Sequence, residues 1–482
     1  MPCTTILVGK KASYDGSTIV ARNEDSSSGE FCPKRFVARP APTAGDVYQS
    51  VISHLKIELP EGGARYTALP NADLKEGLWE EAGFNARNVG MSATETLTSN
   101  ERVLAADPLV RYDAATDTPG GIGEEDMVTL VLPYATSARD GVLRLGALLE
   151  RHGTYEMNGI AFSDADEIWW LETVGGHHWI ARRVPDDCYV TMPNQLGIDD
   201  FDLTDAFGAQ RDHLCSSDLR EWMEAHHLDL TMGVPTGHFN PREAFGSHSD
   251  ADHVYNTPRA WAIQRALNPH AGPWDTAAPA ADFGPESDTL PWCREPERKV
   301  TIEDVKYVLS LHYQGTPYDP YAGGAQGGRY RPIGINRNSQ LAVLQLRPYV
   351  DAERAALQWV AYGSNVFNAL VPLYANVEET PAYLENTTTR VTSENFYWAN
   401  RLVGALADAA YGACLPHVER YQEALTSRCA ALVRACDEED GELAACNQAI
   451  ADACRTATED LLDKVLYEAS MRMRNGFSRS DN

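Results

Sequence analysis

Cys3 is the residue of this chain best placed for nucleophilic chemistry, because it lies close to the amino terminus. It opens an apolar run, Cys3–Gly9, that has the composition of a β-strand. If the residues before it are removed, its own α-amino group lies beside its thiol and can take the thiol proton. Nucleophile and general base would then belong to one residue. The position therefore indicates a thiol nucleophile that is activated by its own amine.

A second apolar run, Thr18–Ala21, is expected to return charged side chains to Cys3. Turn-forming residues separate the two runs, so the pair predicts a β-hairpin whose far end carries Arg22 and Asp25 beside the sulfur. A neighbouring guanidinium favours thiolate over thiol. A carboxylate can orient a free α-amine and hold its proton. A surface hairpin with a salt-bridged end fits the same residues, so the hairpin alone leaves both interpretations open.

Several polar motifs farther along the chain decide between these interpretations. With Cys3, Arg22 and Asp25, they resemble the bacterial cysteine dipeptidases of the dipeptidase A family. These are relatives of choloylglycine hydrolase and penicillin V acylase among the N-terminal nucleophile hydrolases. The resemblance runs from Cys3 to about Val377, with the segments in family order. The motifs are residues 88–96, 121–126, 192–195, 255–261 and 312–319.

The resemblance implies a role for each matching residue. Cys3 is expected to be the nucleophile, with Arg22 and Asp25 as its catalytic companions. Asn194 matches the asparagine that donates a hydrogen bond to the oxyanion. Arg259 matches an arginine that stabilises the site electrostatically.

The chain departs from the acylases at Ser92–Glu95, where they place another asparagine. Thr94 or its backbone is expected to take over that oxyanion-hole role. Glu95 is expected to meet a substrate ammonium, because a carboxylate suits a free peptide amino terminus better than a bile-acid or penicillin side chain. Thr94 and Glu95 are therefore the predicted substrate-binding residues.

Met1 and Pro2 precede the expected nucleophile. The mechanism needs a free amine on Cys3, so either Pro2 is removed by self-cleavage or by another peptidase, or the true start of the chain differs. Without that trimming the chain is expected to be inactive.

The fold implied by the resemblance is α+β, a four-layer αββα sandwich with a C-terminal helical extension. The catalytic domain is expected over residues 3–377. Four short strand-like runs between residues 159 and 192 are separated by turn residues, which predicts a meander. A strand is also predicted near residues 51–57.

Helical periodicity dominates the end of the chain and predicts the extension over residues 391–475. Breaks are expected near Pro416 and at residues 437–441. These helices are expected to pack against the sandwich or to mediate a homo-oligomer.

Composition limits the partners and the compartment. The chain has 482 residues, and its 41 basic and 69 acidic side chains give a net charge of −28. So acidic a surface disfavours nucleic acid and anionic membranes as partners. No early segment has the pattern of a signal peptide, and no apolar stretch approaches the roughly eighteen residues that span a bilayer. A cytoplasmic enzyme is therefore expected.

The ten cysteines are expected to be free thiols, because a long chain without a secretion signal rarely depends on disulfides. Half of them lie late in the chain and include no Cys-x-x-Cys pair, so no zinc site is predicted there. Buried packing is their expected role. They are Cys414, Cys429, Cys436, Cys446 and Cys454.

The predicted activity is hydrolysis of dipeptides through a thioester on Cys3, with no metal or organic cofactor. An amidase of the penicillin V or conjugated bile-acid type is the alternative, and Glu95 argues against it. A non-enzymatic binding or assembly protein, in which Pro2 is never removed, is a third possibility. The sequence assigns no role to His312 or Asp319, although both lie in family-like stretches.

Overall fold

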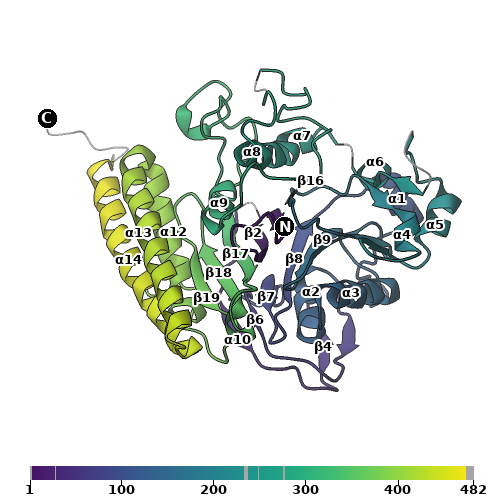
Figure 1. Cartoon of the computed structure of the whole chain (residues 1–482), viewed down its shortest axis with the longest axis horizontal. Coiled ribbons are helices and arrows are strands. Elements are labelled where there is room, and N and C mark those ends of the chain that lie inside the picture. Colours follow the sequence, from purple (N-terminus) through teal and green to yellow (C-terminus); the bar gives the residue numbers. More distant parts are fainter. Residues whose placement is uncertain (1–2, 28, 233–236, 248, 275–276, 474–482) are drawn as a thin grey trace.

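Two β-sheets stacked against each other form the centre of the molecule (Figure 1). The computed structural model describes residues 3–27, 29–232, 237–247, 249–274 and 277–473. The mixture of helices and sheets confirms the α+β class. The predicted removal of Met1 and Pro2 concerns residues outside the described ranges.

The first sheet has seven strands in the order β16-β12-β1-β2-β17-β18-β19. Its strand pairs are antiparallel, and the predicted hairpin of β1 and β2 is confirmed at its centre. Gly16, with φ of +84°, makes the turn before β2 in a conformation that other residues rarely adopt. The strands are β1 (Cys3–Val8), β2 (Thr18–Asp25), β12 (Tyr189–Met192), β16 (Cys293–Arg294), β17 (Asn338–Leu346), β18 (Ala356–Tyr362) and β19 (Val371–Tyr374).

The second sheet has six strands in the order β14-β11-β10-β9-β8-β7. The predicted meander is confirmed for β9, β10 and β11, but the fourth predicted strand, β12, leaves this sheet and pairs with β1. That crossing joins the two sheets and brings the segment after β12 to Cys3. The strands are β7 (Ala82–Phe84), β8 (Gly90–Thr96), β9 (Asn158–Ser163), β10 (Ile168–Thr173), β11 (Trp179–Arg183) and β14 (His213–Cys215).

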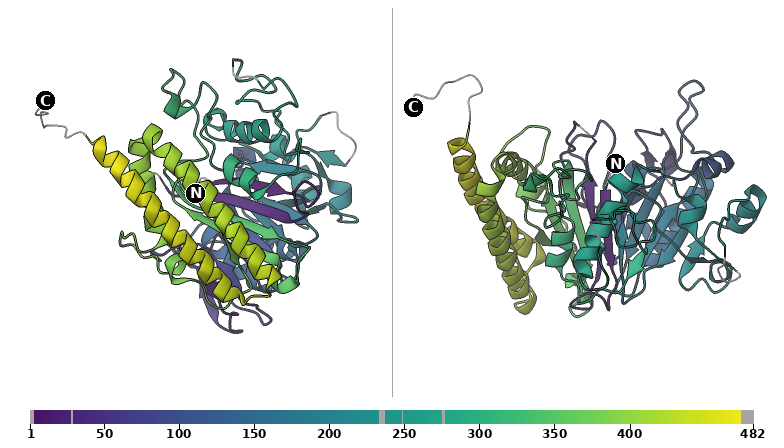
Figure 2. Two further views of the ribbon diagram at one scale, coloured as in Figure 1. Left: turned by 60° about the vertical axis from the view of Figure 1, so that its left-hand side comes forward. Right: turned by 90° about the horizontal axis from the view of Figure 1, so that it is seen from above.

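Helices cover the outer face of each sheet. α2 (Glu124–Val131) and α3 (Ala138–His152) pack on the six-stranded sheet. α12 (Phe396–Ala409), α13 (Tyr411–Glu438) and α14 (Leu443–Met471) pack on β18 and β19 of the other sheet. Figure 2 shows α13 and α14 side by side along that face. Buried side chains of α12–α14 and of the seven-stranded sheet belong to one hydrophobic cluster.

Shorter elements complete the structure. α7 (Asp252–Tyr255) and α8 (Thr257–Leu267) follow one another, and α8 packs on β12. No helix in the described ranges is both long and apolar enough to cross a membrane. The remaining elements are β3 (Val37–Arg39), β4 (Val47–Gln49), β5 (Lys56–Glu58), β6 (Tyr66–Ala68), β13 (Phe201–Asp202), β15 (His238–Phe239), α1 (Glu101–Ala106), α4 (Leu203–Ala206), α5 (Leu219–His226), α6 (Pro241–Phe245), α9 (Ile302–Val308), α10 (Ala352–Ala355), α11 (Ala382–Glu385) and the 3₁₀ turns Leu132–Tyr134 and Pro320–Ala322.

Two predicted local features are wrong. α13 continues through Pro416 instead of breaking there, and the interruption lies at Ala410, with φ of −131° and ψ of 39°. Pro416 is near the start of α13, so the helix gives up one hydrogen bond, to the carbonyl of Gly412. The expected strand over residues 51–57 is mostly irregular, and only its end belongs to β5. The break expected at residues 437–441 is confirmed between α13 and α14.

The expectation that all cysteines are free thiols is also wrong. Cys436 and Cys446 form a disulfide, with their Cα atoms 6.2 Å apart. The tight connection between α13 and α14 brings the end of one helix against the start of the next, so these two cysteines meet although they share no short motif. Cys414, Cys429 and Cys454 are free and buried, as predicted.

Candidate active site

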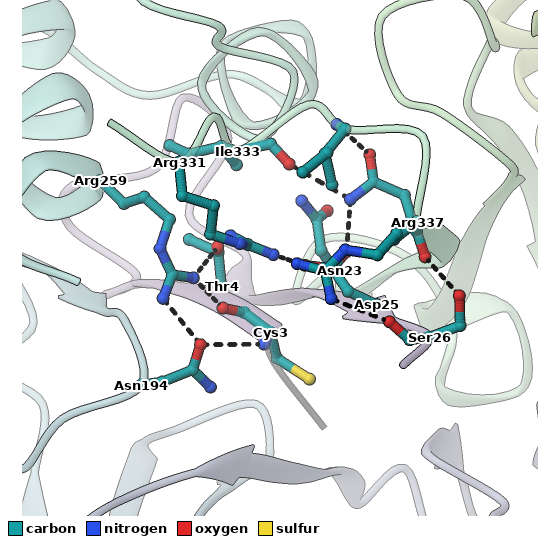
Figure 3. Close-up of polar contacts among 12 residues, drawn as sticks. Cys3, Thr4, Asn23, Asp25, Ser26, Asn194, Arg259, Arg331, Ile333 and Arg337 are labelled. Atoms are coloured by element: carbon teal, nitrogen blue, oxygen red, sulfur yellow. Dashed lines mark hydrogen bonds and ion pairs between the residues drawn. The ribbon is translucent and has the colours of Figure 1, made fainter. Parts of the chain in front are cut away.

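Cys3 lies at the first position of β1, between β2 and β12, and its side chain is fully buried (Figure 3). In the β1–β2 ladder Cys3 faces Glu24 and Thr5 faces Arg22. Cys3 and Thr5 are two residues apart on one strand and therefore point to the same face of the sheet. Arg22 consequently reaches the sulfur diagonally across the ladder.

The guanidinium of Arg22 contacts the sulfur directly. Its Nη1 donates to Cys3 Sγ at 3.2 Å and to the Thr94 carbonyl at 2.7 Å. Burial raises the pKa of the Cys3 thiol well above its usual value, and the Arg22 charge opposes that rise. Cys3 in this environment is a thiol that needs a base, with a cation in place to stabilise the thiolate once it forms.

Arg22 is held in place by acceptors on the facing sheet. Nη2 donates to Glu81 Oε2 at 2.5 Å and to the Ala93 carbonyl at 2.8 Å, while Nε donates to Ser92 Oγ at 3.0 Å. Burial alone would lower the pKa of Arg22, but the carboxylate of Glu81 and other neighbouring groups raise it overall. The guanidinium is therefore a fixed positive charge.

A second buried cation lies behind this pair. Lys34 Nζ is 2.8 Å from Glu24 Oε2 and 3.2 Å from Glu81 Oε1, and the three side chains are inaccessible to solvent. Burial, followed by the Glu81 charge, raises the pKa of Glu24 to about 8. The sequence did not point to Glu81 or Lys34, because neither lies in a segment with a catalytic pattern.

Asn194 and Arg259 hold the backbone of Cys3. The Cys3 N–H donates to Asn194 Oδ1 at 3.2 Å, and Arg259 Nη2 donates to the same oxygen at 2.7 Å. Arg259 Nη1 donates to the Cys3 carbonyl and, at 2.7 Å, to Thr4 Oγ1. Asn256 supports both, since its Nδ2 donates to the Asn194 carbonyl at 3.0 Å and its Oδ1 accepts from Arg259 at 2.7 Å. The nitrogen of Cys3 is thus as firmly placed as its sulfur.

Glu95 lies under Asn194. Its two oxygens accept hydrogen bonds from Asn194 Nδ2 at 2.8 Å and from Thr5 Oγ1 at 2.7 Å. The side chain is fully buried, and burial raises its pKa to about 8 despite the opposing Arg259 charge. Asn194 Nδ2 also donates to the Thr96 carbonyl at 3.0 Å. The arrangement orients the Asn194 amide so that its oxygen faces the nitrogen of Cys3.

Thr94 occupies a bulge in β8. The β8–β9 register shifts between Ala93 and Glu95, so Thr94 has no partner in that ladder. Its side-chain hydroxyl is buried and lacks a hydrogen-bond partner among the described residues. The Thr94 carbonyl and the Cys3 sulfur both accept from Arg22 Nη1, so the Thr94 hydroxyl, which has no partner among the described residues, lies on a residue close to the Cys3 thiol. Bulges beside active sites commonly redirect one side chain in this way.

Asp25 ends β2 on the same side of the molecule. Its carboxylate accepts hydrogen bonds from Arg331 and from Asn338, which pairs with it on β17 (Figure 3). Arg22 and Asp25 are three residues apart on a strand and point to opposite faces, so they act on different sides of Cys3. Arg331 was missed by sequence reasoning because it comes from an irregular segment after a glycine cluster.

A cavity of about 370 Å³ adjoins the Asn194 side of the site. Its lining residues come from three parts of the chain. The lining residues are Thr96, Thr98, Asn194, Ser247, Ser249, Ala251, Asp252, Tyr255 and Asn256.

His312 and Asp319 form a pair away from this network. His312 Nδ1 lies 3.0 Å from Asp319 Oδ1, and the His312 ring packs edge-on against Tyr411 at the start of α13. Within the described parts of the chain, no group of three or more His, Cys, Asp or Glu side chains could hold a metal ion.

Comparisons with known proteins identify the family of this chain. The model of peptidase family C69 matches residues 2–424. A dipeptidase of Bifidobacterium longum is 59% identical to this chain, and a probable dipeptidase A of Streptococcus pyogenes serotype M3 is 52% identical; each alignment covers 100% of both chains. Dipeptidase A of Lactobacillus helveticus is 42% identical over 97% of this chain and 96% of its own.

Proposed function

Because this chain belongs to peptidase family C69 and is a dipeptidase, we propose that it cleaves dipeptides with Cys3 as the nucleophile of a thioester mechanism. The observation that carries the proposal is the double fixation of Cys3. Arg22 contacts its sulfur at 3.2 Å, and Asn194 accepts from its nitrogen at 3.2 Å. Both atoms that the reaction needs are thereby placed on one buried residue.

The reaction begins once Met1 and Pro2 are gone and the nitrogen of Cys3 is a free amine. That amine takes the thiol proton while the sulfur attacks the scissile carbonyl carbon. The amine then gives the proton to the leaving nitrogen as the C–N bond breaks, which leaves a thioester. Water adds to the thioester, and the C–S bond breaks as the sulfur regains its proton. Asn194 Oδ1 keeps the lone pair of the amine directed at the reacting atoms.

The oxyanion is assigned to Thr94 and Asn194. The Thr94 hydroxyl is the better donor in this arrangement, because it has no partner among the described residues, whereas both hydrogens of Asn194 Nδ2 already bind Glu95 and Thr96. A donor at such a position contributes about 3–4 kcal/mol to transition-state stabilisation in other enzymes.

Asp25 and Arg259 complete the catalytic set. Arg259 fixes the Cys3 carbonyl and, through Asn194, the amine. Asp25 supplies the negative charge at the strand end that holds the protonated amine. Glu95 contributes by holding Asn194 in place. The sequence also predicts that Glu95 binds a substrate ammonium, and the oxygen lone pairs that Thr5 and Asn194 do not occupy would accept those hydrogen bonds.

The finer architecture also belongs to this proposal. Sheets covered by α2 and α3 on one side and by α12–α14 on the other support the αββα sandwich. The division into a catalytic domain, residues 3–377, and a helical extension, residues 391–475, stays a prediction. The same holds for the homo-oligomeric state and the cytoplasmic location.

Acid quenching during turnover tests the proposal. The mature enzyme is mixed with a dipeptide, quenched within milliseconds and analysed by intact mass, with penicillin V and a glycine-conjugated bile acid as comparison substrates. An adduct equal to the amino-terminal acyl group, located on Cys3 and formed from the dipeptide alone, is expected. Rapid hydrolysis of the dipeptide by a Cys3→Ala enzyme would contradict the thioester, and faster cleavage of the acyl-amide substrates would favour the amidase alternative.

A further inference from the structure

Arg331 is a buried cation with hydrogen bonds left unmade. Its Nη2 donates to Asp25, but its Nε and Nη1 have no hydrogen-bond partner among the described residues. Only 7% of the residue is exposed. Burying donors without partners is unfavourable unless a ligand or ordered water completes them.

The electrostatic environment of Arg331 also favours the binding of an anion. Burial, together with the nearby Arg337 charge, lowers the pKa of Arg331 to about 9, and Cys3 opposes that effect. The Asp25 carboxylate is shared with Asn338, so it serves more than one donor. A second carboxylate beside Arg331 would therefore relieve both the unmade hydrogen bonds and the charge.

Arg331 lies at the nucleophile. Asp25, its partner, is one residue beyond Glu24, and Glu24 faces Cys3 in the ladder. The ring of Tyr255 lies between two arginines, with the guanidinium carbons of Arg331 and Arg259 at 4.9 Å and 5.2 Å from its centre. Figure 3 shows Arg331 extending toward the strand end that carries Cys3 and Asp25. Tyr255 also lines the cavity that Asn194 lines.

We propose that Arg331 binds the free α-carboxylate of the dipeptide through the guanidinium donors that have no partner among the described residues, Nη1 and Nε. Hydrogen bonds from a guanidinium to a carboxylate are charge-assisted and therefore among the strong ones. This inference rests on the proposed function, since it assumes that the scissile carbonyl is attacked by Cys3.

The same contact limits the length of the substrate. In a dipeptide, only the amide nitrogen and one Cα separate the scissile carbonyl carbon from the carboxylate carbon, a distance of about 3–4 Å. In an extended substrate, each further residue after the scissile bond would move the carboxylate about 3.3–3.6 Å farther from the scissile carbonyl. A fixed guanidinium beside the nucleophile can therefore bind the C-terminal carboxylate of a dipeptide but not that of a tripeptide.

The experiment measures the binding of a non-cleavable dipeptide analogue, with CH₂ in place of the scissile carbonyl, and of its C-terminal amide. Isothermal titration is done on the mature wild-type enzyme and on the R331M, R331K and R337M variants. Arg337 is the matched control, because it is a neighbouring cation whose Nη1 and Nη2 already donate to Ser26 and Tyr255. Circular dichroism and thermal melting verify that each variant is folded.

The wild type and R337M are expected to prefer the carboxylate over the amide by about 10- to 100-fold, the range of charge-assisted hydrogen bonds. In R331M the preference falls to near one, and in R331K it is intermediate. An unchanged preference in R331M, or no preference in the wild type, would overturn the inference and leave Arg331 as a positioning residue for Asp25. Because binding needs no turnover, this result is independent of whether Cys3→Ala abolishes hydrolysis, which tests the proposed function.

Discussion

The guanidinium of Arg22 donates to the sulfur of Cys3 at 3.2 Å, and neither side chain is accessible to solvent to any useful extent. The contact is created by strand register, since Arg22 faces Thr5 and reaches Cys3 along the diagonal. Burial raises the pKa of the thiol and Arg22 lowers it. Among the charges that act on the thiol, Arg22 is the one that most opposes the effect of burial.

Replacing Arg22 should raise the pKa of Cys3 further. We expect R22M to lower kcat by about 100-fold or more, since a positioned ionic group commonly contributes that much, and R22K to lose less because it keeps the charge. The rate of alkylation of Cys3 by iodoacetamide, measured against pH, should move to higher pH in R22M. An unmoved alkylation profile would show that Arg22 does not tune the thiol. Thermal melting serves as the control, because R22M removes one of the two buried cations that contact Glu81.

Thr94 offers a sharper test of the oxyanion assignment. T94V preserves the shape of the side chain and removes the unpaired hydroxyl, so kcat is expected to fall by about 10²-fold with little change in KM. T94S keeps the hydroxyl and is expected to stay within a few-fold of the wild type. Equal rates for T94V and T94S would shift the oxyanion to Asn194 or to the backbone.

Glu95 should make stability depend on pH. Its pKa is raised from 4.5 in the free side chain to about 8 by burial. An acid whose folded-state pKa is raised stabilises the fold fully below its unfolded pKa, and this stabilisation is lost as pH rises toward the folded value. The melting temperature of the wild type should decline between about pH 5 and pH 8, and E95Q should decline less.

Glu172 is the matched control for Glu95. It is buried, and burial raises its pKa to about 7, but its partners are Trp170 and the N–H groups of Gly197 and Ile198. E172Q should also flatten the pH dependence of the melting temperature. Activity should change only in E95Q, because Glu95 holds Asn194 and Glu172 does not. If E95Q and E172Q lose activity equally, the role of Glu95 in orienting Asn194 is wrong.

The Cys436–Cys446 disulfide should stabilise the α13–α14 pair. Closing a short loop of this kind contributes about 2–3 kcal/mol, so C446S should lower the free energy of unfolding by that amount. Dipeptide hydrolysis should be unchanged, because the bond lies on the outer helices. Guanidinium denaturation of both forms measures the difference. Thiol titration of the unreduced, unfolded chain provides the check: if Cys436 and Cys446 both react, the bond is absent.

The hairpin and its charges were predictable because they depend on neighbouring residues. Two short apolar runs, a glycine turn and a charged strand end place Arg22 near Cys3 without reference to the rest of the chain. Roles for Asn194 and Arg259 came from resemblance, and the structure brings both to the backbone of Cys3.

Long-range partners were not predictable. Arg331 meets Asp25 across 306 positions, and Arg22 meets Glu81 across 59, and neither pairing leaves a periodic signal. The strand β12 looked like the end of a meander, yet it changes sheets, because local turn chemistry does not specify which edge a strand joins. For Pro416 the error was one of position: the interruption lies at Ala410, and α13 runs through the proline at the loss of one hydrogen bond.

Intact mass combined with activity shows whether the amine of Cys3 is the base. The purified enzyme is weighed and assayed on a dipeptide beside its Cys3→Ala variant. We predict that the active enzyme has the mass of a chain beginning at Cys3 and that the variant does not hydrolyse the dipeptide. Full activity in a protein that retains Met1 and Pro2, whose Cys3 nitrogen is an amide, would contradict the account.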